Sequence, residues 1–565
     1  MPSLSNVIAL GLLGVGLSVV GQLALLYKEL KYAKPPDTPA PFVCPSLDEV
    51  AALNRFRGLI AFPSVSNASR EDHVNDQQVF RDMVSYLERS YPLVWERLQV
   101  EKVGLNGLSL LITWPGSRPE LPPVLFVSHY DVVPVTHGSE AGSEAGSEEQ
   151  WIHPPFSGDL ADGYVWGRGS ADIKFSVAAL LQAATQLLQG GQQQQQGEGA
   201  GEGEGAGEGE GAFSFAPERT ILFAFGHDEE LGGWHGANAT AALLLSRGVD
   251  QLDLVVDEGG AVLVDGMRPF TRTPVAMVGL AEKGYATLTV TLRSPGGHSS
   301  MPPTDGSDLL SQIWRLTTAL KLMPTPARLQ PPVSDMLVHM APYTPPWMRV
   351  LLVAAGRPGL LNRLLAELLH RLGGREVGSL VAPTLALTRL TGGVADNVLP
   401  QRGVMGFNAR LLPGGGGGGG GGPEEVVGRL RRAAAMAGVK AEVALSGQDL
   451  MWPASRVTPA DGRHFRLMRQ AIQETWQQLQ EGQPGPPAVA PFLVMGGTDS
   501  KHYAALSRGG VLRFVPYALN KSAGDLGRIH ATNERIRADS FPRAVCTYAR
   551  LMQLLAGPGA GPYGQ

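Results

Sequence analysis

The sequence predicts an α/β fold, with a mixed sheet flanked by helices and a smaller α+β domain inserted into the chain. Three observations support this prediction: short apolar runs that end in polar residues, helical stretches that follow these runs, and a middle section in which apolar and polar residues alternate. With 565 residues, 43% of them hydrophobic, the chain can bury two substantial cores.

Four apolar runs are typical of strands buried on both faces, because each is short and bounded by turn-forming residues. They cover residues 124–128, 221–225, 252–256 and 511–517. Helical stretches are expected at 176–188 and 464–479. Alternating strands and helices imply a sheet that binds ligands at the carboxyl ends of its strands. His, Asp and Glu residues lie at or beyond these ends, so we expect the functional site there.

The middle of the chain has a different pattern, in which apolar residues alternate with threonine and other polar residues. Half-exposed strands are expected at 286–292, 384–390 and 404–411. Residues 347–372 form a strongly apolar helical stretch, expected either to pack on the inserted domain or a partner subunit, or to face a membrane. The predicted division is an N-terminal segment (1–40), two parts of a main domain (45–283 and 449–556) and an inserted domain (284–448).

The N-terminus contains a run of 21 uncharged residues, 7–27, followed by three lysines. That length spans a bilayer, which favours a membrane anchor; a cleaved signal segment and a buried core helix are the alternatives. The lysines favour a cytoplasmic main domain, whereas glycosylation sequons at Asn67, Asn238 and Asn520 favour the lumen or the exterior. We therefore expect a membrane-anchored protein or one of the secretory pathway (vacuolar, lumenal or extracellular), with its orientation open.

The composition excludes several classes of function. A net charge of −5 without a broad basic field argues against a nucleic-acid partner. The only two cysteines, Cys44 and Cys546, are too few for a disulfide framework or a thiolate metal site, so any metal must bind His, Asp and Glu. Low-complexity tracts at 138–149, 190–211 and 414–422 are expected to be solvated loop expansions, because they bury too little apolar surface to offset their ordering entropy.

Several residues at the predicted strand ends have metal-binding chemistry. His129 and Asp131 lie two apart, so the carboxylate could orient the imidazole of a metal ligand; a structural hydrogen-bonded pair is the alternative, and the favoured one for this pair taken alone. Asp172 follows a glycine-rich turn, where a helix cap is the structural alternative. The adjacent Glu229 and Glu230 repel each other unless a cation or a proton separates their roles. One could bind metal while the other takes a proton from metal-bound water; two solvent-facing glutamates are the alternative.

A second acidic pair, Asp257 and Glu258, follows another buried strand, and His530 supplies a further imidazole. Two histidines and three carboxylates from separate strand ends make an oxygen-rich site for two divalent ions, with one carboxylate bridging them. Successive strand residues point to opposite faces, so only one member of the pair is expected to reach the metal. Asp257 is the predicted ligand, and Glu258 is the alternative.

These motifs, in this order, resemble those of the M-twenty family of dizinc metallopeptidases, which includes aminoacylases, carboxypeptidases and dipeptidases. The resemblance extends from about residue 45 to 555 and points to the subgroup of the vacuolar Gly-X carboxypeptidase and the secreted N-fatty-acyl-amino-acid hydrolase/synthase. One departure is Ile173, which stands where the subgroup usually has an acidic residue. The motifs are His129-Tyr-Asp131, Gly167-Arg-Gly-Ser-Ala-Asp172, His227-Asp-Glu-Glu230, Asp257-Glu-Gly-Gly260, Gly297-His-Ser-Ser300, Gly497-Thr-Asp-Ser500 and His530.

The resemblance implies a zinc-peptidase main domain and an inserted lid or dimerisation domain, with two Zn²⁺ per subunit and a homodimeric assembly. The implied zinc ligands are Asp172 as the bridge, His129 and Asp257 on one ion, and Glu230 and His530 on the other. Glu229 would be the general base, and Asp131 would orient His129. In the inserted domain, His298 resembles a histidine that stabilises the oxyanion, often from a partner subunit, and Asn397 and Arg410 resemble residues that hold the substrate carboxylate.

The activity implied is zinc-dependent hydrolysis of an amide bond next to a free carboxylate. N-acyl amino acids are the expected substrates, with reversible condensation as the reverse reaction. A Gly-X carboxypeptidase or dipeptidase acting on short peptides is the alternative within the enzymes. A non-catalytic binding protein on the same fold is the alternative of another class.

Overall fold

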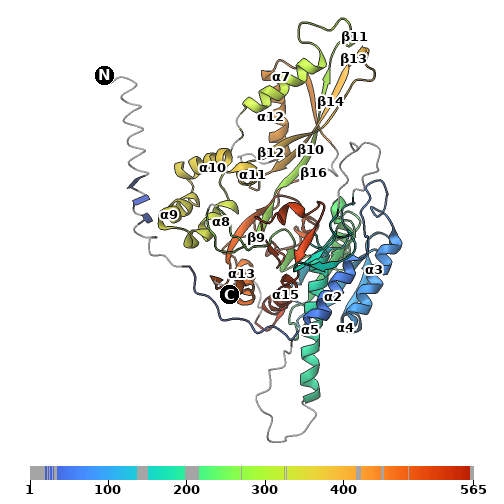
Figure 1. Ribbon diagram of the computed structural model, residues 1–565, viewed down its shortest axis with the longest axis vertical. Coiled ribbons are helices and arrows are strands. Elements are labelled where there is room, and N and C mark those ends of the chain that lie inside the picture. The colour runs from blue at the N-terminus through green and yellow to red at the C-terminus, as the bar shows by residue number, and fades with distance from the viewer. Residues whose placement is uncertain are drawn as a thin grey trace.

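The computed structural model describes residues 20–21, 23–24, 26–27, 30, 35–135, 151–197, 215–268, 270–323, 325, 327–414, 422–446, 451–480 and 483–559. A ten-stranded mixed sheet forms the centre of the main domain, and a smaller sheet forms an inserted domain that extends away from it (Figure 1). This arrangement confirms the α/β fold that the sequence predicts.

The central sheet has the strand order β1-β2-β6-β3-β7-β20-β9-β8-β21, with β19 paired to β9. Strand β3 pairs in parallel with β6 and β7, and β20 continues the parallel set beyond β7. The carboxyl ends of these strands therefore meet at one edge. The strands are β1 (Gln99–Val103), β2 (Ser109–Trp114), β3 (Val124–His129), β6 (Ile221–Gly226), β7 (Leu254–Asp257), β8 (Val262–Leu263), β9 (Val275–Glu282), β19 (Ala488–Val494), β20 (Val511–Arg513) and β21 (Ala518–Leu519).

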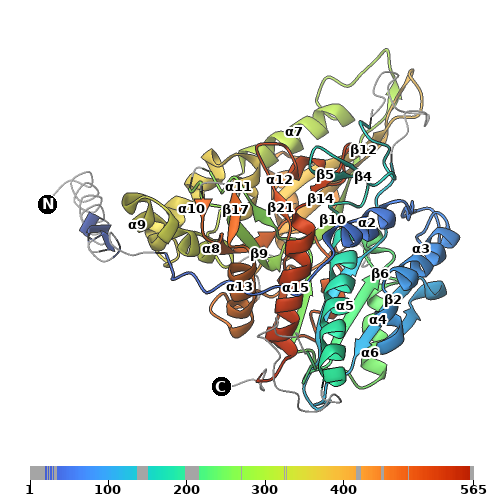
Figure 2. The ribbon, with the colours of Figure 1, turned by 60° about the horizontal axis from the view of Figure 1, so that its bottom comes forward.

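Helices cover both faces of this sheet, which explains why its strands are continuous apolar runs. In β3, Val124 and Phe126 enter one core, whereas Leu125 and Val127 enter the core on the opposite face. The first core is covered by α2 (Glu49–Ile60), α3 (Gln77–Ser90), α4 (Pro92–Arg97), α5 (Lys174–Gly197), α13 (Arg463–Thr475) and α15 (Ser540–Ala556), several of which are visible side by side in Figure 2. The second core is covered by α6 (Ala237–Ser246) and α14 (Ser500–Tyr503).

The inserted domain contains a five-stranded antiparallel sheet of order β12-β14-β10-β15, with β16 paired to β10. Helices α7 (Leu309–Leu322) and α12 (Pro423–Met436) pack on one face of it. The strands are β10 (Gly284–Arg293), β12 (Thr384–Gly392), β14 (Arg402–Leu411), β15 (Ala441–Leu445) and β16 (Met451–Trp452), so the three predicted strands are confirmed. A two-stranded antiparallel sheet of β11 (Gly297–His298) and β13 (Val398–Leu399) forms the tip (Figure 1).

The apolar stretch at 347–372 forms two helices within a helical group that packs on the central sheet. Met336 and Leu337 share a buried core with Val275 and Met277 of β9 and with Ala490 of β19. These helices therefore contact the main domain, although in the sequence they lie between two strands of the inserted sheet, β10 and β12. They are α8 (Val333–Met340), α9 (Pro346–Ala355), α10 (Leu360–Leu372) and α11 (Gly374–Val381).

Three local predictions differ from the structure. Helix α5 continues to Gly197, so the start of the 190–211 tract is helical and the loop prediction is wrong there. Strand β20 ends at Arg513, where the next residue's N–H turns to the carbonyl of Asp257, rather than continuing to 517. Helix α13 ends at Thr475, and the chain enters the short hairpin of β17 (Gln478–Gln480) and β18 (Gln483–Pro484). Residues 138–149, 198–211 and 415–421 of the low-complexity tracts lie outside the described residues.

Most of the apolar run at 7–27 also lies outside the described residues. Within the described part of the chain, no helix is both long enough and apolar enough to cross a membrane. The described residues between 20 and 30 are helical, and Leu23, Leu26 and Leu30 pack on α9 and α10 through Val350 and Leu361.

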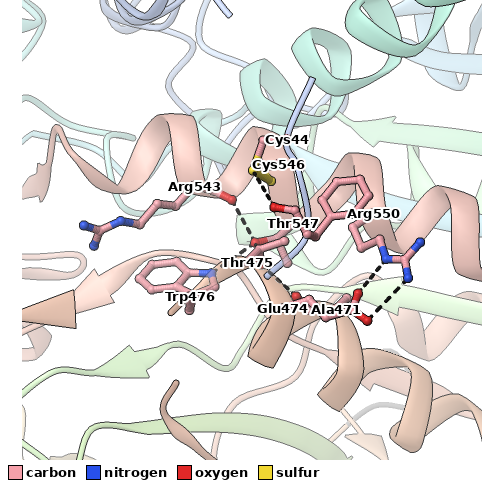
Figure 3. Close-up of a disulfide and its surroundings, with 10 residues drawn as sticks. Cys44, Ala471, Glu474, Thr475, Trp476, Arg543, Cys546, Thr547 and Arg550 are labelled. Carbon is pink, nitrogen blue, oxygen red and sulfur yellow. Dashed lines mark hydrogen bonds and ion pairs between the residues drawn. A yellow bond between two sulfur atoms is a disulfide. The ribbon is translucent and has the colours of Figure 1, made fainter. Parts of the chain in front are cut away.

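A disulfide joins Cys44 to Cys546 of α15, with 5.3 Å between their Cα atoms (Figure 3). The sequence does not predict this pairing, because 502 residues separate the two cysteines. The preceding residues are fastened to the same region, since the N–H of Phe42 donates to the carbonyl of Glu474 at 3.0 Å and the Arg550 guanidinium lies over the Phe42 ring. The chain between the N-terminal helix and α2 is therefore held along α13 and α15.

Candidate metal centre

The carboxyl ends of three neighbouring strands bring the predicted metal-binding residues together. His129 is the last residue of β3, and Asp257 is the last residue of β7. The turn after β6 leads into a short 3₁₀ helix, Glu229–Leu231. Asp172 and His530 come from loops that are held side by side by the pairing of β5 (Tyr164–Trp166) with β22 (Arg535–Arg537). Strand β5 also pairs with β4 (Asp159–Ala161).

Asp172 lies between the two histidines. Its Oδ1 is 3.2 Å from Nε2 of His129, and its Oδ2 is 2.7 Å from Nε2 of His530. A carboxylate that presents one oxygen to each of two imidazole nitrogens has the arrangement of a bridging metal ligand. Burial opposes ionisation of Asp172, but the adjacent imidazoles of His129 and His530 hold its pKa well below the usual value.

Two further carboxylates flank this bridge, one beside each histidine. Glu258 Oε1 lies 3.2 Å from Nε2 of His129, and Glu230 Oε2 lies 3.3 Å from Nε2 of His530. The cluster thus divides into two halves that share Asp172, each with one imidazole and one carboxylate of its own. These are the donor types that zinc prefers where no thiolate is present.

The structure places Glu258, the predicted alternative, beside His129, and gives Asp257, the predicted ligand, other contacts. Asp257 Oδ2 faces away from His129 and accepts hydrogen bonds from Thr498 Oγ1 at 2.7 Å and the Ser500 N–H at 2.8 Å. Adjacent residues at a strand end point to opposite sides, so turning Glu258 into the cluster turns Asp257 out of it. The register of β7 in the folded sheet decides this point.

Glu229 lies beside the cluster, with Oε2 3.7 Å from Nε2 of His129. Burial raises the pKa of this carboxyl well above its usual value, an effect that the positive charge of His129 opposes. A buried carboxyl with a raised pKa is suited to accept a proton near neutral pH.

Asp131 connects the His129 ring to the loop that carries the two glutamates. Nδ1 of His129 lies 3.1 Å from the backbone oxygen of Asp131 and 3.3 Å from its Oδ1. The N–H groups of Glu229 and Glu230 donate to the two carboxylate oxygens of Asp131, each at 3.1 Å. The arrangement suits the predicted role of orienting the imidazole, and it also fixes the start of the 3₁₀ helix.

Glu534 is a site residue that sequence reasoning did not assign. Its Oε1 accepts hydrogen bonds from the N–H groups of Ala171 at 2.9 Å and Asp172 at 3.2 Å, and its Oε2 pairs with Arg168 at 2.6 Å. Glu534 thereby fixes the loop of the bridging carboxylate to the loop of His530. The available signal was its position four residues after His530 in the sequence.

The donor atoms fit bound cations. Nε2 of His129 and Oε1 of Glu230 are buried and make no hydrogen bond to any residue that the structure describes. Burial raises the pKa of Glu230 to about 7, and burial together with the nearby Asp172 charge raises that of Glu258 to about 8. Carboxylates this close repel one another, and divalent ions would relieve that repulsion. Two sets of residues each bring three ligand atoms within 4.8 Å of one another. One set is His129, Glu229 and Glu258, and the other is His129, Asp172 and Glu230.

The three residues predicted in the inserted domain lie apart from this cluster. His298 is exposed on β11 at the tip of the domain, where the N–H of Ser299 donates to the Asn397 carbonyl at 3.1 Å (Figure 1). Arg410 lies on β14, with its guanidinium 4.8 Å from the centre of the Tyr285 ring. Within one subunit, the structure does not bring these side chains to the metal-binding residues, and their roles stay predictions.

A cavity of about 890 Å³ opens from the cluster. Asp172, Glu229, Glu258 and His530 line one part of it. Most of the remaining wall is apolar and comes from four regions of the chain. These apolar lining residues include Leu263, Met267, Met277, Val377, Leu380, Phe492, Met495, Tyr517, Leu519, Leu526 and Ile529. The exposed ion pair of Lys521 and Glu376 also lines the cavity and marks where it reaches the surface.

A crowded cluster of imidazoles and carboxylates at the carboxyl edge of an α/β sheet, beside a cavity, defines a metal-dependent enzyme. The chain belongs to peptidase family M20/M25/M40, whose family model matches residues 125–198 and 211–554.

Named relatives cover most of the chain. The N-fatty-acyl-amino acid synthase/hydrolase PM20D1 of Xenopus tropicalis is 30% identical over 89% of this chain and 85% of its own length. The human protein of that name is 29% identical over 90% of this chain and 88% of its own. Carboxypeptidase S of Saccharomyces cerevisiae is 27% identical over 86% of this chain and 81% of its own.

Solved structures share the fold at low sequence identity. The M20 family metallo-carboxypeptidase Sso-CP2 of Sulfolobus solfataricus has a TM-score of 0.55 and 16% identity, covering 90% of this chain and 99% of its own. Human carnosine dipeptidase 1 has a TM-score of 0.53 and 15% identity, covering 94% of this chain and 98% of its own.

Proposed function

We propose that the protein hydrolyses N-acyl amino acids that carry a long apolar acyl chain, and that it also catalyses the reverse condensation. The observation that carries this proposal is the cavity that runs from the carboxylate cluster along a predominantly apolar wall. Its volume lies within the range of roughly 300–1,000 Å³ that is typical of small-molecule sites. The names of the PM20D1 relatives support the same substrate class.

The proposed cofactor is a pair of Zn²⁺ ions, held by Asp172 as the bridge, by His129 and Glu258, and by His530 and Glu230. When bound, such a pair lowers the pKa of water and polarises the scissile carbonyl. Asp131 keeps the His129 ring in place, and Glu534 keeps Asp172 in place.

Glu229 is the proposed general base. It accepts a proton from the attacking water, and the same carboxyl then donates that proton to the amine that leaves as the scissile bond breaks. Burial raises the pKa of this carboxyl well above its usual value, which favours its taking up the proton.

The proposed contacts to the oxyanion (His298) and to the substrate carboxylate (Asn397 and Arg410) come from the inserted domain of a second subunit. Strand β12 supports such an assembly, since it forms an edge of the inserted sheet and most of its residues are exposed. Its exposed Leu387 and Leu390 provide apolar surface for a partner. A homodimer would therefore complete the site.

We place the protein in the secretory pathway, because a disulfide such as Cys44–Cys546 persists in oxidising compartments. The sequons at Asn67, Asn238 and Asn520 agree with this location. Loss of apparent mass on treatment with an N-glycosidase would support this location. It would be contradicted if the protein in cells carried no glycan and its two cysteines were reduced.

A substrate series tests the proposed activity. We expect kcat/KM to rise steeply from N-acetyl to N-long-chain-acyl amino acids, because each buried methylene contributes about 0.8 kcal/mol, or roughly fourfold. The Gly-Leu dipeptide is the comparison substrate. A flat or falling acyl series with Gly-Leu cleaved best would establish the carboxypeptidase alternative, which the likeness to carboxypeptidase S favours. Full zinc occupancy with no hydrolysis of either class would indicate a binding protein.

A further inference from the structure

Helix α10 exposes a row of leucines on its outer side. Leu360, Leu364, Leu368 and Leu372 follow one another at intervals of four and are 47%, 56%, 50% and 76% exposed. Residues at this spacing lie along one side of a helix. The other side is used for packing, since Ala366 is fully buried there. Helix α10 therefore has apolar side chains on both its inner and its outer side. The described chain covers the inner side and leaves the outer side exposed.

The N-terminal helix lies next to this leucine row. Leu26 is 7% exposed and packs with Val350 and Ala354 of α9, and Leu361 of α10 joins the same cluster. The Arg349 side chain donates from Nη1 to the carbonyl of Leu30 at 2.9 Å. The described N-terminal residues lie beside α9 in both views (Figures 1 and 2). Leu23, Leu26 and Leu30 thus lie beside α9 and α10.

Two attachments hold the chain that follows the apolar run to the folded body. Arg349 binds the carbonyl of Leu30, and the disulfide at Cys44 holds the following segment to α15. Between them, the Gln477 side chain donates to the carbonyl of Pro39 at 3.1 Å. A bilayer that covers the outer face of α10 would contact its leucines, and Trp347 of α9 is also 60% exposed.

The charges around the leucine row suit an anionic surface. Within residues 357–375 the basic side chains are Arg357, Arg363, Arg371 and Arg375, all of them exposed. The one acidic residue of this range is Glu367, which pairs with Arg371 at 2.5 Å. Lysines 28, 31 and 34 follow the apolar run in the sequence. Apolar side chains flanked by basic ones are typical of helices that lie in the interface of an anionic bilayer.

The acyl cavity borders the same region. Helix α11 follows α10 after a single residue, and its Val377 and Leu380 line the cavity. Glu376 belongs to α11, and Lys521 pairs with it. This ion pair marks where the cavity reaches the surface. The opening of the cavity thus lies beside the helix that carries the exposed leucines.

We propose that the outer face of α10 rests on a phospholipid bilayer with anionic headgroups, and that acyl substrates enter the cavity from this bilayer past α11. The second part rests on the function proposed above, whereas the first does not. The N-terminal run and the basic flanks select a bilayer rather than a second copy of the chain as the occupant of this face.

Photocrosslinking tests the contact without using activity. The full chain is reconstituted into vesicles of phosphatidylcholine and phosphatidylserine, with Leu364 replaced by p-benzoyl-phenylalanine. Leu310 on α7 is the matched control position, since it is a leucine that is 77% exposed on the inserted domain. We expect lipid adducts at 364 to exceed those at 310 by roughly tenfold. The reason is that a side chain at 364 would lie within the bilayer interface, whereas one at 310 would stay in water. Equal yields, or a covalent dimer of the chain formed at 364, would overturn the proposal.

A kinetic comparison tests substrate entry. The double variant Leu364→Asp/Leu368→Asp should lower kcat/KM by roughly tenfold for a long-chain N-acyl amino acid embedded in vesicles. It should leave kcat/KM unchanged for a soluble short-chain analogue, and Leu310→Asp should change neither. An equal loss on both substrates, or no loss on the embedded one, would overturn entry from the bilayer. If the parent chain cleaves no N-acyl amino acid, the proposed function fails, and the crosslinking result still decides the membrane contact.

Discussion

Glu258 and His129 face each other across 3.2 Å, from Oε1 to Nε2, at the ends of neighbouring parallel strands. Asp257, one residue earlier, is instead enclosed by Thr498 and Ser500 on the other side of the strand. The two adjacent carboxylates therefore have different tasks: one belongs to the metal-binding cluster, and the other holds the turn that follows β19.

Substitution of this pair distinguishes the two tasks. Glu258→Gln should lower bound zinc to about one ion per chain, because one half of the site loses its own carboxylate. Asp257→Asn is the matched control and should keep the zinc content while lowering the free energy of unfolding by about 1–3 kcal/mol through its altered hydrogen bonds. Elemental analysis and denaturant titration measure the two effects. The opposite pattern would assign the ligand to Asp257.

Glu229→Gln should retain about two zinc ions and lose activity by roughly 10²–10⁴-fold, the contribution expected of a general base. The amide preserves the size of the side chain but cannot accept the proton. Zinc content and kcat are measured on the same preparation. A variant that loses metal together with activity would make Glu229 a ligand instead.

Val377→Trp should narrow the acyl cavity from the side of α11. We expect a fall in kcat/KM for long acyl chains of about fourfold for each methylene that no longer fits, with little change for N-acetyl substrates. Val377→Leu is the conservative control. A loss of the same size for every chain length would show that this wall does not contact the acyl group.

The double variant Cys44→Ser/Cys546→Ser should lower the free energy of unfolding by up to about 5 kcal/mol, because the disulfide closes a very long loop in the unfolded chain. Thermal unfolding of the oxidised parent, the reduced parent and the variant measures this. The reduced parent should match the variant. Identical unfolding temperatures for all three would mean that the bond contributes nothing to stability.

Stability should also depend on pH through His502, whose Nε2–H donates to the carbonyl of Gly232 at 2.8 Å. Burial lowers the pKa of His502 to about 4 from an ordinary value of 6.5. Between these values the unfolded chain binds a proton that the folded chain does not. The contribution that neutral His502 makes to the free energy of unfolding is therefore fully present above pH 6.5, and it is lost as the pH falls toward 4.

The full shift corresponds to about 3 kcal/mol, and solvent at this partly exposed ring reduces it to about 1–2 kcal/mol. His502→Gln should reduce the loss of stability between pH 6.5 and 4 by that amount relative to the parent. Parallel denaturant titrations across this range measure the difference. Superimposable pH profiles would show that another group causes the acid sensitivity.

The sequence by itself determined the parts of the protein that depend on local patterns. The buried strands β3, β6 and β7 were predictable because short apolar runs bounded by turn residues must be covered on both faces. The same runs place His129, Glu229 and Glu230 at strand ends, and parallel ends converge at one edge. The sequence also predicted the inserted sheet, since the alternation in β10, β12 and β14 needs only a period of two.

Only the tertiary structure decided what depends on side-chain direction or on contacts between distant segments. It turned Glu258 toward the cluster instead of Asp257, joined Cys44 to Cys546, and placed Glu534 beneath Asp172. It also continued α5 into a glutamine tract whose composition indicated a loop. The physical reason is common to these cases: strand register, long-range pairing and helix extension are set by the packing of the whole chain, which no local pattern of residues encodes.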